Sequence, residues 1–288
     1  MLLTILFIAY KMPQIAHKVN VTGTSILIQA CQSEPNPPRF AFASSYSVFG
    51  PSNSDKEKPL LTPSSPVNPV DSYGKHKVMC EKYLHENYTR GRGYCILRLG
   101  AVSVQLTRAL LQPPTPETDK LLYGIPHNQR RHGVHSRDVG RAFVNAVTME
   151  SKDAVNGKVF LIGGDASWCI RSHHMLDVVY GVLGFGKANP LDYRIATTDN
   201  SWYFEDWMDT TESQRILQFQ QMTFEDWARE LGEEVKGMSF FQRKGMRLLA
   251  PIIRWTFHRK SRHYLFNKNG KKDPLSDKPM DQVVENAS

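Results

Sequence analysis

Residues 39–45 read RFAFASS, residues 73–88 read YGKHKVMCEKYLHENY, and residues 94–99 read YCILRL. The first and third stretches have the length and pattern of strands, whereas the middle stretch carries apolar residues at helical spacing. Together they predict a strand, a helix and a strand, which is the repeating unit of a parallel sheet. The rest of the fold follows by extending this unit in both directions.

The residues before this unit add a further strand and helix. Leu2 to Tyr10 is a continuous apolar run bounded by Lys11 and Pro13, which is typical of a buried strand in a parallel sheet. Residues 14–32 carry apolar positions at helical spacing and predict a helix. Strands that alternate with helices in this way predict a parallel sheet with right-handed crossovers, which is half of a doubly wound α/β fold.

The residues after the unit continue the alternation. We predict helices at 138–149 and 175–183, a short strand at 158–162, and a helix, turn and helix at 214–231. In the last pair Thr223 is the predicted N-cap, and Asp226 stands at the third helical position, near a capping-box arrangement. GVLGFG at 181–186 follows a helix, so it predicts a helix end and a turn and not a phosphate-binding loop.

The composition indicates a globular protein with an uneven charge distribution. The 288 residues are 41% hydrophobic and 10% aromatic, which is enough for a substantial core in one or two domains. The net charge of +8 arises between Lys236 and Lys272, where 11 of the 36 Lys and Arg residues fall without any Asp or Glu, leaving 25 basic against 28 acidic residues elsewhere. Because the excess is confined to this tail, without a zinc-ligand pattern or an aromatic RNA-binding motif, nucleic acid is not a predicted partner.

The cysteines and the N-terminus favour a cytoplasmic location. Cys31, Cys80, Cys95 and Cys169 form no CxxC pair and lie in apolar patterns, where cysteine behaves as a small hydrophobe. The opening MLLTILFIAY has no basic residue before its apolar run, and it is far shorter than the roughly 20 residues that span a bilayer. We therefore predict a reducing compartment and no signal peptide.

The motif with the most chemical content is Tyr73-Gly-Lys-His-Lys77, which Ser45 precedes by 28 residues at the end of a strand. Tyr73 and Lys77 are four residues apart on one helix and project from the same face. A free tyrosine has a pKa of roughly 10, and the positive charge of Lys77 can stabilise its phenolate. Ser45 can hydrogen-bond the same substrate oxygen, which completes a site for moving a proton while a hydride moves to or from a nicotinamide.

A Tyr and a Lys at this spacing are most often a packed ring beside a solvated cation, so the surrounding sequence decides the interpretation. The motifs occur in the order and spacing of a known group: VNVTGT (19–24), RFAFASSYSVFG (39–50), PVDSYGKHKVMCEKYL (69–84) and YCILRLGAV (94–102). On these motifs the chain resembles the extended short-chain dehydrogenase/reductase superfamily, of the NAD-dependent epimerase/dehydratase type. The resemblance covers about residues 15–165 and weakens to about 235.

The resemblance implies roles for particular residues. Ser45, Tyr73 and Lys77 match the family's catalytic Ser, Tyr and Lys, and the Lys also holds the nicotinamide ribose. Ser44 is the neighbouring alternative, although the spacing to Gly50 matches Ser45. Asn20 matches an asparagine near the cofactor pocket. The implied cofactor is NAD or NADP, the implied substrate is a small molecule, and the family's dimers predict a homodimer through the helix of Tyr73 and its neighbour.

RRHGVHSRDVGRAF at 130–143 resembles the family's segment leading into a helix beside the substrate cleft. An ordinary helix start, with Asp138 favourable to the helix dipole, explains the same residues. Both interpretations stay open.

One departure from the family concerns the cofactor. A dinucleotide-binding fold needs a glycine-rich turn between its first strand and helix, because the backbone must approach the pyrophosphate. The only glycine before Ser45 is Gly23, inside a predicted helix. We therefore expect a partial Rossmann-like sheet that lacks its first strands, which indicates an N-terminally truncated enzyme or a non-catalytic remnant.

A second departure concerns the substrate. Arg98 is followed by Leu99, Gly100 and Ala101, where sugar-nucleotide epimerases of the superfamily carry an aromatic pair and an Asn. This difference adds a hydrophobic, steroid-like alcohol or ketone to the nucleotide sugars as a candidate substrate.

The predicted organisation has three parts. A Rossmann-like domain without the glycine-rich turn spans 1–165, a substrate-side helical region spans 166–235, and a basic, partly apolar extension spans 236–288. From 240 to 266 the extension interleaves large apolar residues with cations. This composition suits peripheral contact with an anionic membrane, and it equally suits packing of an apolar side on the protein itself.

Overall fold

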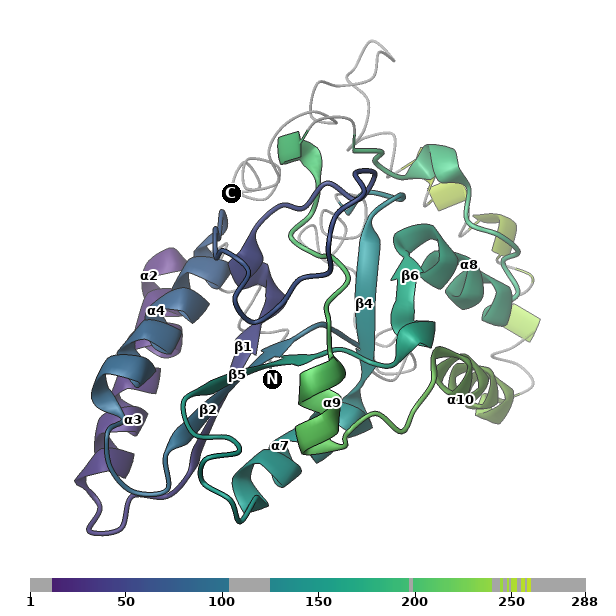
Figure 1. Cartoon of the computed structure of the whole chain (residues 1–288). Coiled ribbons are helices and arrows are strands. Elements are labelled where there is room, and N and C mark those ends of the chain that lie inside the picture. The colour runs from purple at the N-terminus through teal and green to yellow at the C-terminus, as the bar shows by residue number, and fades with distance from the viewer. Residues whose placement is uncertain are drawn as a thin grey trace.

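The computed structural model describes residues 12–103, 125–196 and 199–239, with short pieces between 244 and 259. Its centre is a parallel sheet of three strands, β1 (Phe40–Ser45), β2 (Tyr94–Leu99) and β5 (Lys158–Ile162), in the order β1-β2-β5 (Figure 1). The predicted α/β class and the three strands are thereby confirmed. The strand predicted at Leu2–Tyr10 lies outside the described residues.

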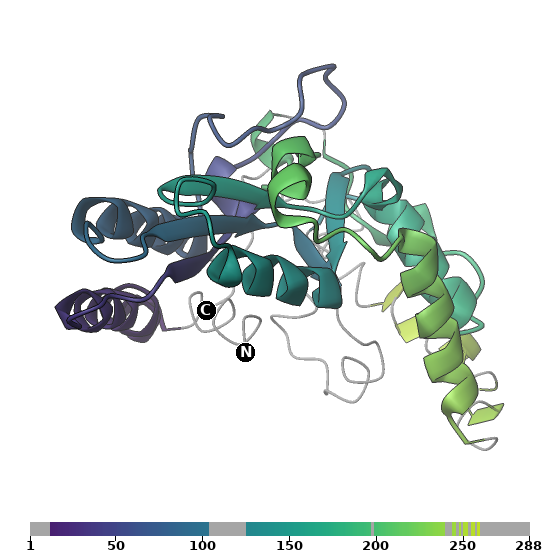
Figure 2. The ribbon, with the colours of Figure 1, turned by 60° about the horizontal axis from the view of Figure 1, so that its bottom comes forward.

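Helices cover both faces of this sheet (Figure 2). The pair α3 (Gly23–Ser33) and α4 (Ser72–Asn87) lies on one face, where it packs on strand side chains such as Phe42 and Ile96. On the other face lies α7 (Ser136–Thr148), which packs on the residues of alternate strand positions such as Leu97. The sheet is therefore buried on both sides, as its nearly continuous apolar strands predict.

The helix predicted at 14–32 is continuous but not uniform. It consists of α2 (Pro13–His17), a π-helical turn, η1 (Lys18–Thr22), and α3. Ile28 of α3 is buried against α4, whereas Val19 and Ile26 are exposed. The π turn was not predicted, because apolar periodicity does not distinguish an i to i+5 turn from an i to i+4 turn over so few residues.

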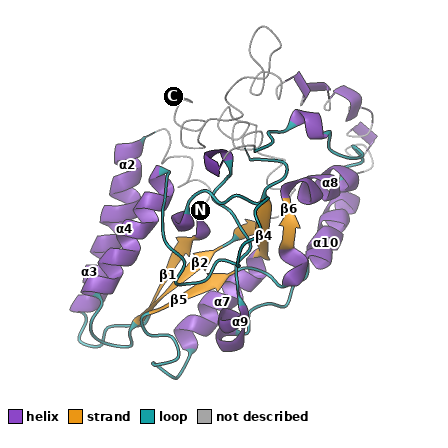
Figure 3. Cartoon of the chain, turned by 45° about the horizontal axis from the view of Figure 1, so that its top comes forward, coloured by secondary structure: helices purple, strands orange, loops and turns teal. Residues whose placement is uncertain are grey.

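A second small sheet stands beside the first (Figure 3). Its strands are β3 (Ala101–Ser103), β4 (Arg130–His135) and β6 (Cys169–Arg171), with β4 parallel to β3 and antiparallel to β6. The sequence predicts that residues 130–143 lead into a helix, and α7 begins at Ser136 directly after β4. The strand itself was not predicted.

The C-terminal half of the described chain is helical. Helix α8 (Ser172–Val182) packs on α10 (Phe224–Gly237) around Trp168, while the short α9 (Thr211–Leu217) packs on β5 and α7. Thr223 and Asp226 form the predicted capping box. Further short 3₁₀ turns are η2 (Tyr46–Phe49), η3 (Ala166–Trp168), η4 (Pro190–Asp192) and η5 (Asp199–Ser201).

One smaller prediction, at the end of α8, is also confirmed. Gly184 and Gly186 both have φ of 77°, so GVLGFG ends α8 and turns the chain. The four cysteines are unpaired.

The loop after β1 is held in place by a segment far along the chain. Leu61 donates a backbone hydrogen bond to Trp207 (2.9 Å) and accepts one from Asp209 (2.8 Å), and Ser52 donates to the carbonyl of Tyr203 (3.3 Å). The loop at 51–61 and the segment at 203–209 therefore form one structural unit.

The basic extension is described only in pieces. Ala250 is buried against Leu183 and Phe185, and His258 lies 2.5 Å from Asp192, whereas Ile252 and Trp255 are exposed. These pieces thus pack one side on the protein and expose an apolar side. Among the residues with described placement, no helix is long and apolar enough to cross a membrane.

Candidate active site

The carboxyl end of β1 and the first turns of α4 bring Ser45, Tyr73 and Lys77 together. Ser45 is the last residue of β1, and Tyr73 and Lys77 lie one turn apart in α4. The side chain of Asp71 caps α4 by accepting a hydrogen bond from the amide of Gly74 (2.9 Å). A Cβ at Gly74 would lie 2.7 Å from the carbonyl oxygen of Ser47, so glycine lets α4 approach the end of β1 closely.

Ser45 is the serine that faces Tyr73. The Tyr73 side chain is buried, and the Ser45 side chain opposes the rise in its pKa. The Ser45 hydroxyl also lies 3.1 Å from the hydroxyl of Ser47 and accepts from its amide at 3.2 Å. A ligand oxygen placed between the Ser45 and Tyr73 hydroxyls would meet two hydrogen-bonding groups at once.

The neighbouring serine points elsewhere. Side chains alternate along a strand, and Ser44 donates a hydrogen bond of 2.5 Å to Oε1 of Glu81 on α4. Ser44 is completely buried there. This geometry favours Ser45 over Ser44 as the partner of Tyr73.

Lys77 lies between the aromatic rings of α4 and β1. Its ammonium is 5.3 Å from the ring centre of Tyr73 and 5.1 Å from that of Phe42, and it donates a hydrogen bond of 2.7 Å to the carbonyl of Ala43. Burial lowers the pKa of Lys77, and the negative charge of Glu81 opposes this effect. An ammonium has three N–H donors, and the described chain offers Lys77 the single acceptor Ala43.

The phenol of Tyr73 is harder to ionise than a free tyrosine. Burial raises the pKa of Tyr73 to about 12, the hydrogen bond to Ser45 opposes the rise, and the charge of Asp71 adds to it. The sequence predicts that Lys77 lowers the pKa of Tyr73, and this prediction is wrong for the chain as described, because the loss of solvent dominates. At neutral pH Tyr73 is therefore protonated and able to donate its proton.

This shift can be measured directly. In a spectrophotometric titration, the difference between the wild-type chain and Tyr73→Phe should show a tyrosine that ionises near pH 12, whereas the same difference in urea should give a midpoint near the unperturbed 10.0. Between these two values the unfolded chain releases a proton that folded Tyr73 retains, so folded stability should fall as the pH rises through this window. A folded-state midpoint at or below 10.0 would contradict the assignment.

Asn20 lies on the π turn η1 and contacts α4. Its side-chain amide nitrogen is 3.5 Å from Nδ1 of His76, and its backbone carbonyl oxygen accepts a hydrogen bond from the thiol of Cys80 at 3.1 Å. The structure thus brings Asn20 to the helix that carries Tyr73 and Lys77. Its side-chain contact within the described part of the chain is with His76.

A buried polar cluster beside the site was not predicted. Glu205 forms an ion pair with Arg131 (2.9 Å) and accepts a hydrogen bond from Tyr46, the residue after Ser45. Burial raises the pKa of Glu205, with Arg131 opposing the rise, and burial also raises the pKa of Tyr203 and Tyr46 well above 10.0. Because Tyr46 directly follows Ser45 at the end of β1, this cluster borders the Tyr73 site.

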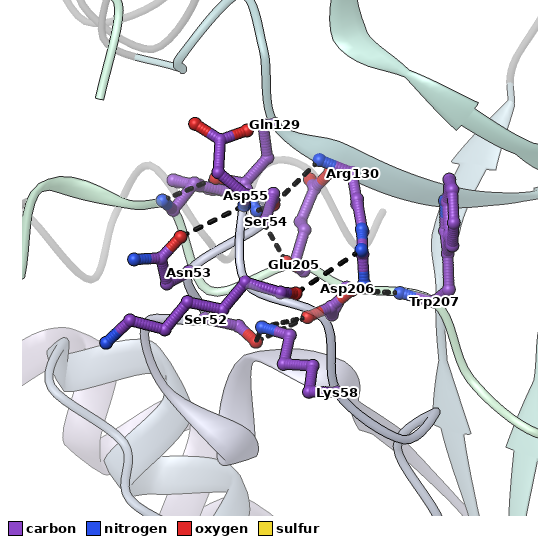
Figure 4. A network of polar contacts seen from close by, with 12 residues as sticks. Ser52, Asn53, Ser54, Asp55, Lys58, Gln129, Arg130, Glu205, Asp206 and Trp207 are labelled. Atoms are coloured by element: carbon purple, nitrogen blue, oxygen red, sulfur yellow. Dashed lines mark hydrogen bonds and ion pairs between the residues drawn. The ribbon is translucent and has the colours of Figure 1, made fainter. Parts of the chain in front are cut away.

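The cluster continues into the loop after β1 (Figure 4). Asp206 accepts from the hydroxyl of Ser52 and pairs with the ammonium of Lys58, both at 2.5 Å. The guanidinium of Arg130 lies 3.8 Å from Asp206 and stacks over Trp207 at 4.6 Å. The only sequence signal for this cluster was the segment at 130–143, which contains both arginines but not their acidic partners.

Comparison with known proteins identifies a family. The family model described as "NAD dependent epimerase/dehydratase family" matches residues 9–163, which is more than half of the chain. A search of curated proteins found no match.

Several solved structures share the fold. A UDP-glucuronic acid 4-epimerase from Bacillus cereus, in complex with UDP-glucuronic acid and NAD, has a TM-score of 0.57 and 18% identity, over 77% of this chain and 69% of that chain. DesIV, a dTDP-glucose 4,6-dehydratase from Streptomyces venezuelae with NAD and TYD bound, has a TM-score of 0.59 and 20% identity, over 80% and 69%. A UDP-glucose 4-epimerase from Thermotoga maritima with UDP-glucose has a TM-score of 0.57 and 19% identity, over 86% and 74%. At these identities the likeness shows the fold.

Proposed function

Since this chain belongs to the NAD dependent epimerase/dehydratase family, we propose that it catalyses NAD(P)-dependent oxidoreduction or epimerisation at a hydroxyl or keto group. The observation that supports this most strongly is the arrangement at the end of β1. Ser45 ends β1 beside the buried Tyr73 and opposes the rise in its pKa, and the ammonium of Lys77 lies 5.3 Å from the Tyr73 ring centre. In a chance Tyr and Lys pair, the lysine would point into solvent and no serine would lie beside the ring. Here Lys77 donates a hydrogen bond to the carbonyl of Ala43, and Ser45 lies beside Tyr73.

The proposed roles follow from this geometry. Tyr73 transfers the proton to or from the substrate oxygen, and Ser45 orients that oxygen by a second hydrogen bond. Lys77 contributes a positive charge beside the phenol and hydrogen bonds to the nicotinamide ribose. When bound, the nicotinamide accepts or returns the hydride.

The residues present fit the nicotinamide end of such a cofactor. Beyond its bond to the Ala43 carbonyl, the Lys77 ammonium retains N–H groups for ribose hydroxyls, and Asn20 lies on the adjacent helix. Similar structures that were crystallised with NAD favour NAD over NADP. We assign no residues to the pyrophosphate, because Gly23 is the only glycine before Ser45.

For the substrate we propose a nucleotide sugar, since the similar structures hold UDP-glucuronic acid or UDP-glucose. A hydrophobic, steroid-like alcohol is the alternative, supported by the sequence after Arg98. In the structure Arg98 is buried and its guanidinium is held by Glu81, so it is already engaged within the protein. We propose that the region at 166–235, which includes α8 and α10, lies on the substrate side.

The second candidate function is a non-catalytic protein that does not bind dinucleotide. The observation in its favour is the absence of a glycine-rich strand-to-helix turn from the sequence. The two candidates differ in one measurable property, which is saturable binding of a nicotinamide nucleotide.

A fluorescence titration of the purified chain with NADH and NADPH separates them. We expect saturable binding, with higher affinity for NADH, and weaker binding by Lys77→Met because an ammonium that donates to the ribose is lost. Lys75→Met is the matched control, since Lys75 is exposed on the same helix. A folded chain that binds neither nucleotide would exclude the enzymatic proposal and support the second candidate.

A further inference from the structure

A buried ion pair lies directly behind the catalytic residues. Arg98 of β2 holds Glu81 of α4 through two hydrogen bonds, Nε to Oε1 at 3.0 Å and Nη2 to Oε2 at 2.8 Å. Both residues are less than a tenth exposed, and the Arg98 guanidinium also stacks over Phe49 at 4.9 Å. This bidentate arrangement fixes the position of the Glu81 carboxylate.

Glu81 connects α4 to the catalytic strand. Its Oε1 accepts the 2.5 Å hydrogen bond from Ser44, the residue next to Ser45. One turn earlier in α4, Lys77 donates to the carbonyl of Ala43, the residue before Ser44. Two successive residues of β1 are thus tied to two successive turns of α4, and Ser45 and Tyr73 lie at the adjoining end of the same interface.

Glu81 follows Lys77 by one turn of α4, and the two side chains hydrogen-bond adjacent residues of β1, Ser44 and Ala43. The titratable groups around the ammonium are Tyr73, Cys80 and Glu81 on α4, with Arg98 behind Glu81 on β2. The neighbouring helix brings His17 against His76, on the side of α4 that faces α2. Burial lowers the pKa of Lys77, and the charges of Cys80 and Glu81 oppose this effect.

We infer that Glu81 is a positioning residue for the Ser45, Tyr73 and Lys77 site, where it places a carboxylate one helical turn from Lys77 and fixes α4 against β1 through Ser44. The catalytic meaning of this inference rests on the proposed function. The structural and electrostatic part of the inference is independent of the proposed function, because it concerns Lys77 in the chain without nucleotide.

The test is competitive labelling of lysines with acetic anhydride across a pH series, read by mass spectrometry. Only the uncharged amine reacts, so the midpoint of the Lys77 profile reports its ionisation. In Glu81→Gln this midpoint should lie roughly one pH unit lower than in the wild-type chain, because an opposite charge nearby has been removed. Lys82, which is exposed on the same helix, serves as the internal reference.

The matched control is Glu86→Gln, since Glu86 is exposed on α4 and pairs with Lys82 at 3.8 Å. It should leave the Lys77 midpoint unchanged. Should Glu81→Gln not fold, Glu81→Asp retains a partner for Arg98 while drawing the carboxylate back by one methylene, and it should give an intermediate midpoint. A folded variant at position 81 with the wild-type Lys77 midpoint would overturn the inference.

Nucleotide titration of the same proteins keeps the two ideas apart. If the wild-type chain does not bind NADH but the Lys77 midpoint falls in Glu81→Gln, the proposed function fails and the role of Glu81 stands. If the wild-type chain binds NADH and the midpoint is unmoved, the proposed function stands and the role of Glu81 fails.

Discussion

Tyr73→Phe should lower turnover by about 10²- to 10⁴-fold, which is the usual contribution of a positioned acid or base. The phenylalanine ring fills the same buried space, so the fold and its thermal unfolding should be unchanged. The loss should appear in kcat, because the proton transfer is made in the transition state. Steady-state rates with the nucleotide sugar or hydrophobic alcohol that the wild-type chain accepts measure it.

Tyr83→Phe provides the control for this experiment. Tyr83 lies on the same helix, and its hydroxyl is 2.6 Å from the side-chain nitrogen of Gln29 and not in the Ser45 site. It should retain the wild-type rate. If Tyr73→Phe also retained it, the assignment of Tyr73 as the acid or base would be wrong, whatever the family of the chain.

Glu205→Ala should cost about 3–5 kcal/mol of unfolding free energy, the typical effect of breaking a buried ion pair. The change leaves the Arg131 guanidinium without its carboxylate and removes the acceptor of the Tyr46 hydroxyl. The effect is large because the Arg131 side chain, which is only 20% exposed, then carries its charge without a counter-charge. Urea denaturation followed by circular dichroism gives the difference.

Two further variants define the cause. Glu212→Ala removes an exposed carboxylate that pairs with Arg215, and it should leave the urea midpoint unchanged. The double change of Glu205→Leu and Arg131→Met removes both buried charges and should recover much of the lost stability. A small effect of Glu205→Ala would mean that water reaches Arg131 readily.

Local patterns were sufficient for the central sheet. The strands around Ala43, Leu97 and Phe160 are apolar because they are covered on both faces, so their sequences identify them without knowledge of the rest of the chain. The same holds for the capping box of Thr223, whose partners are three residues apart. These predictions needed only interactions that are short in sequence or a burial pattern that the strand itself carries.

Strand β4 could not be predicted in this way. Arg130 and Arg131 are charged and would normally mark a solvated segment, but their partners are Asp206 and Glu205, about 75 residues later. Gly133 alone does not reveal the strand either. Glycine is required there because a Cβ would lie 2.4 Å from the ring of Trp168, a contact that only the fold creates. Pairing at such separation leaves no periodic signal in the sequence.

In the candidate site, too, residues of a local motif could be predicted and contacts between distant segments could not. Ser45, Tyr73 and Lys77 were predicted from the spacing of a known motif, and the structure brings them together. Glu81 had a signal, since it follows Lys77 by one helical turn, but its importance depends on Arg98 and Ser44 from two strands. The direction of the Tyr73 pKa shift depends on how much solvent the fold excludes, which no spacing reveals.

The contact between the loop at 51–61 and the segment at 203–209 bears on how the protein is made. A ribosome releases β1, α4 and β2 before residue 103, and these elements can assemble as soon as they emerge. The loop cannot settle with them, because the backbone partners of Ser52 and Leu61 belong to Tyr203, Trp207 and Asp209. During synthesis the loop that follows Ser45 and β1 therefore lacks these backbone partners until residues 203–209 have emerged, so this part of the fold is completed late.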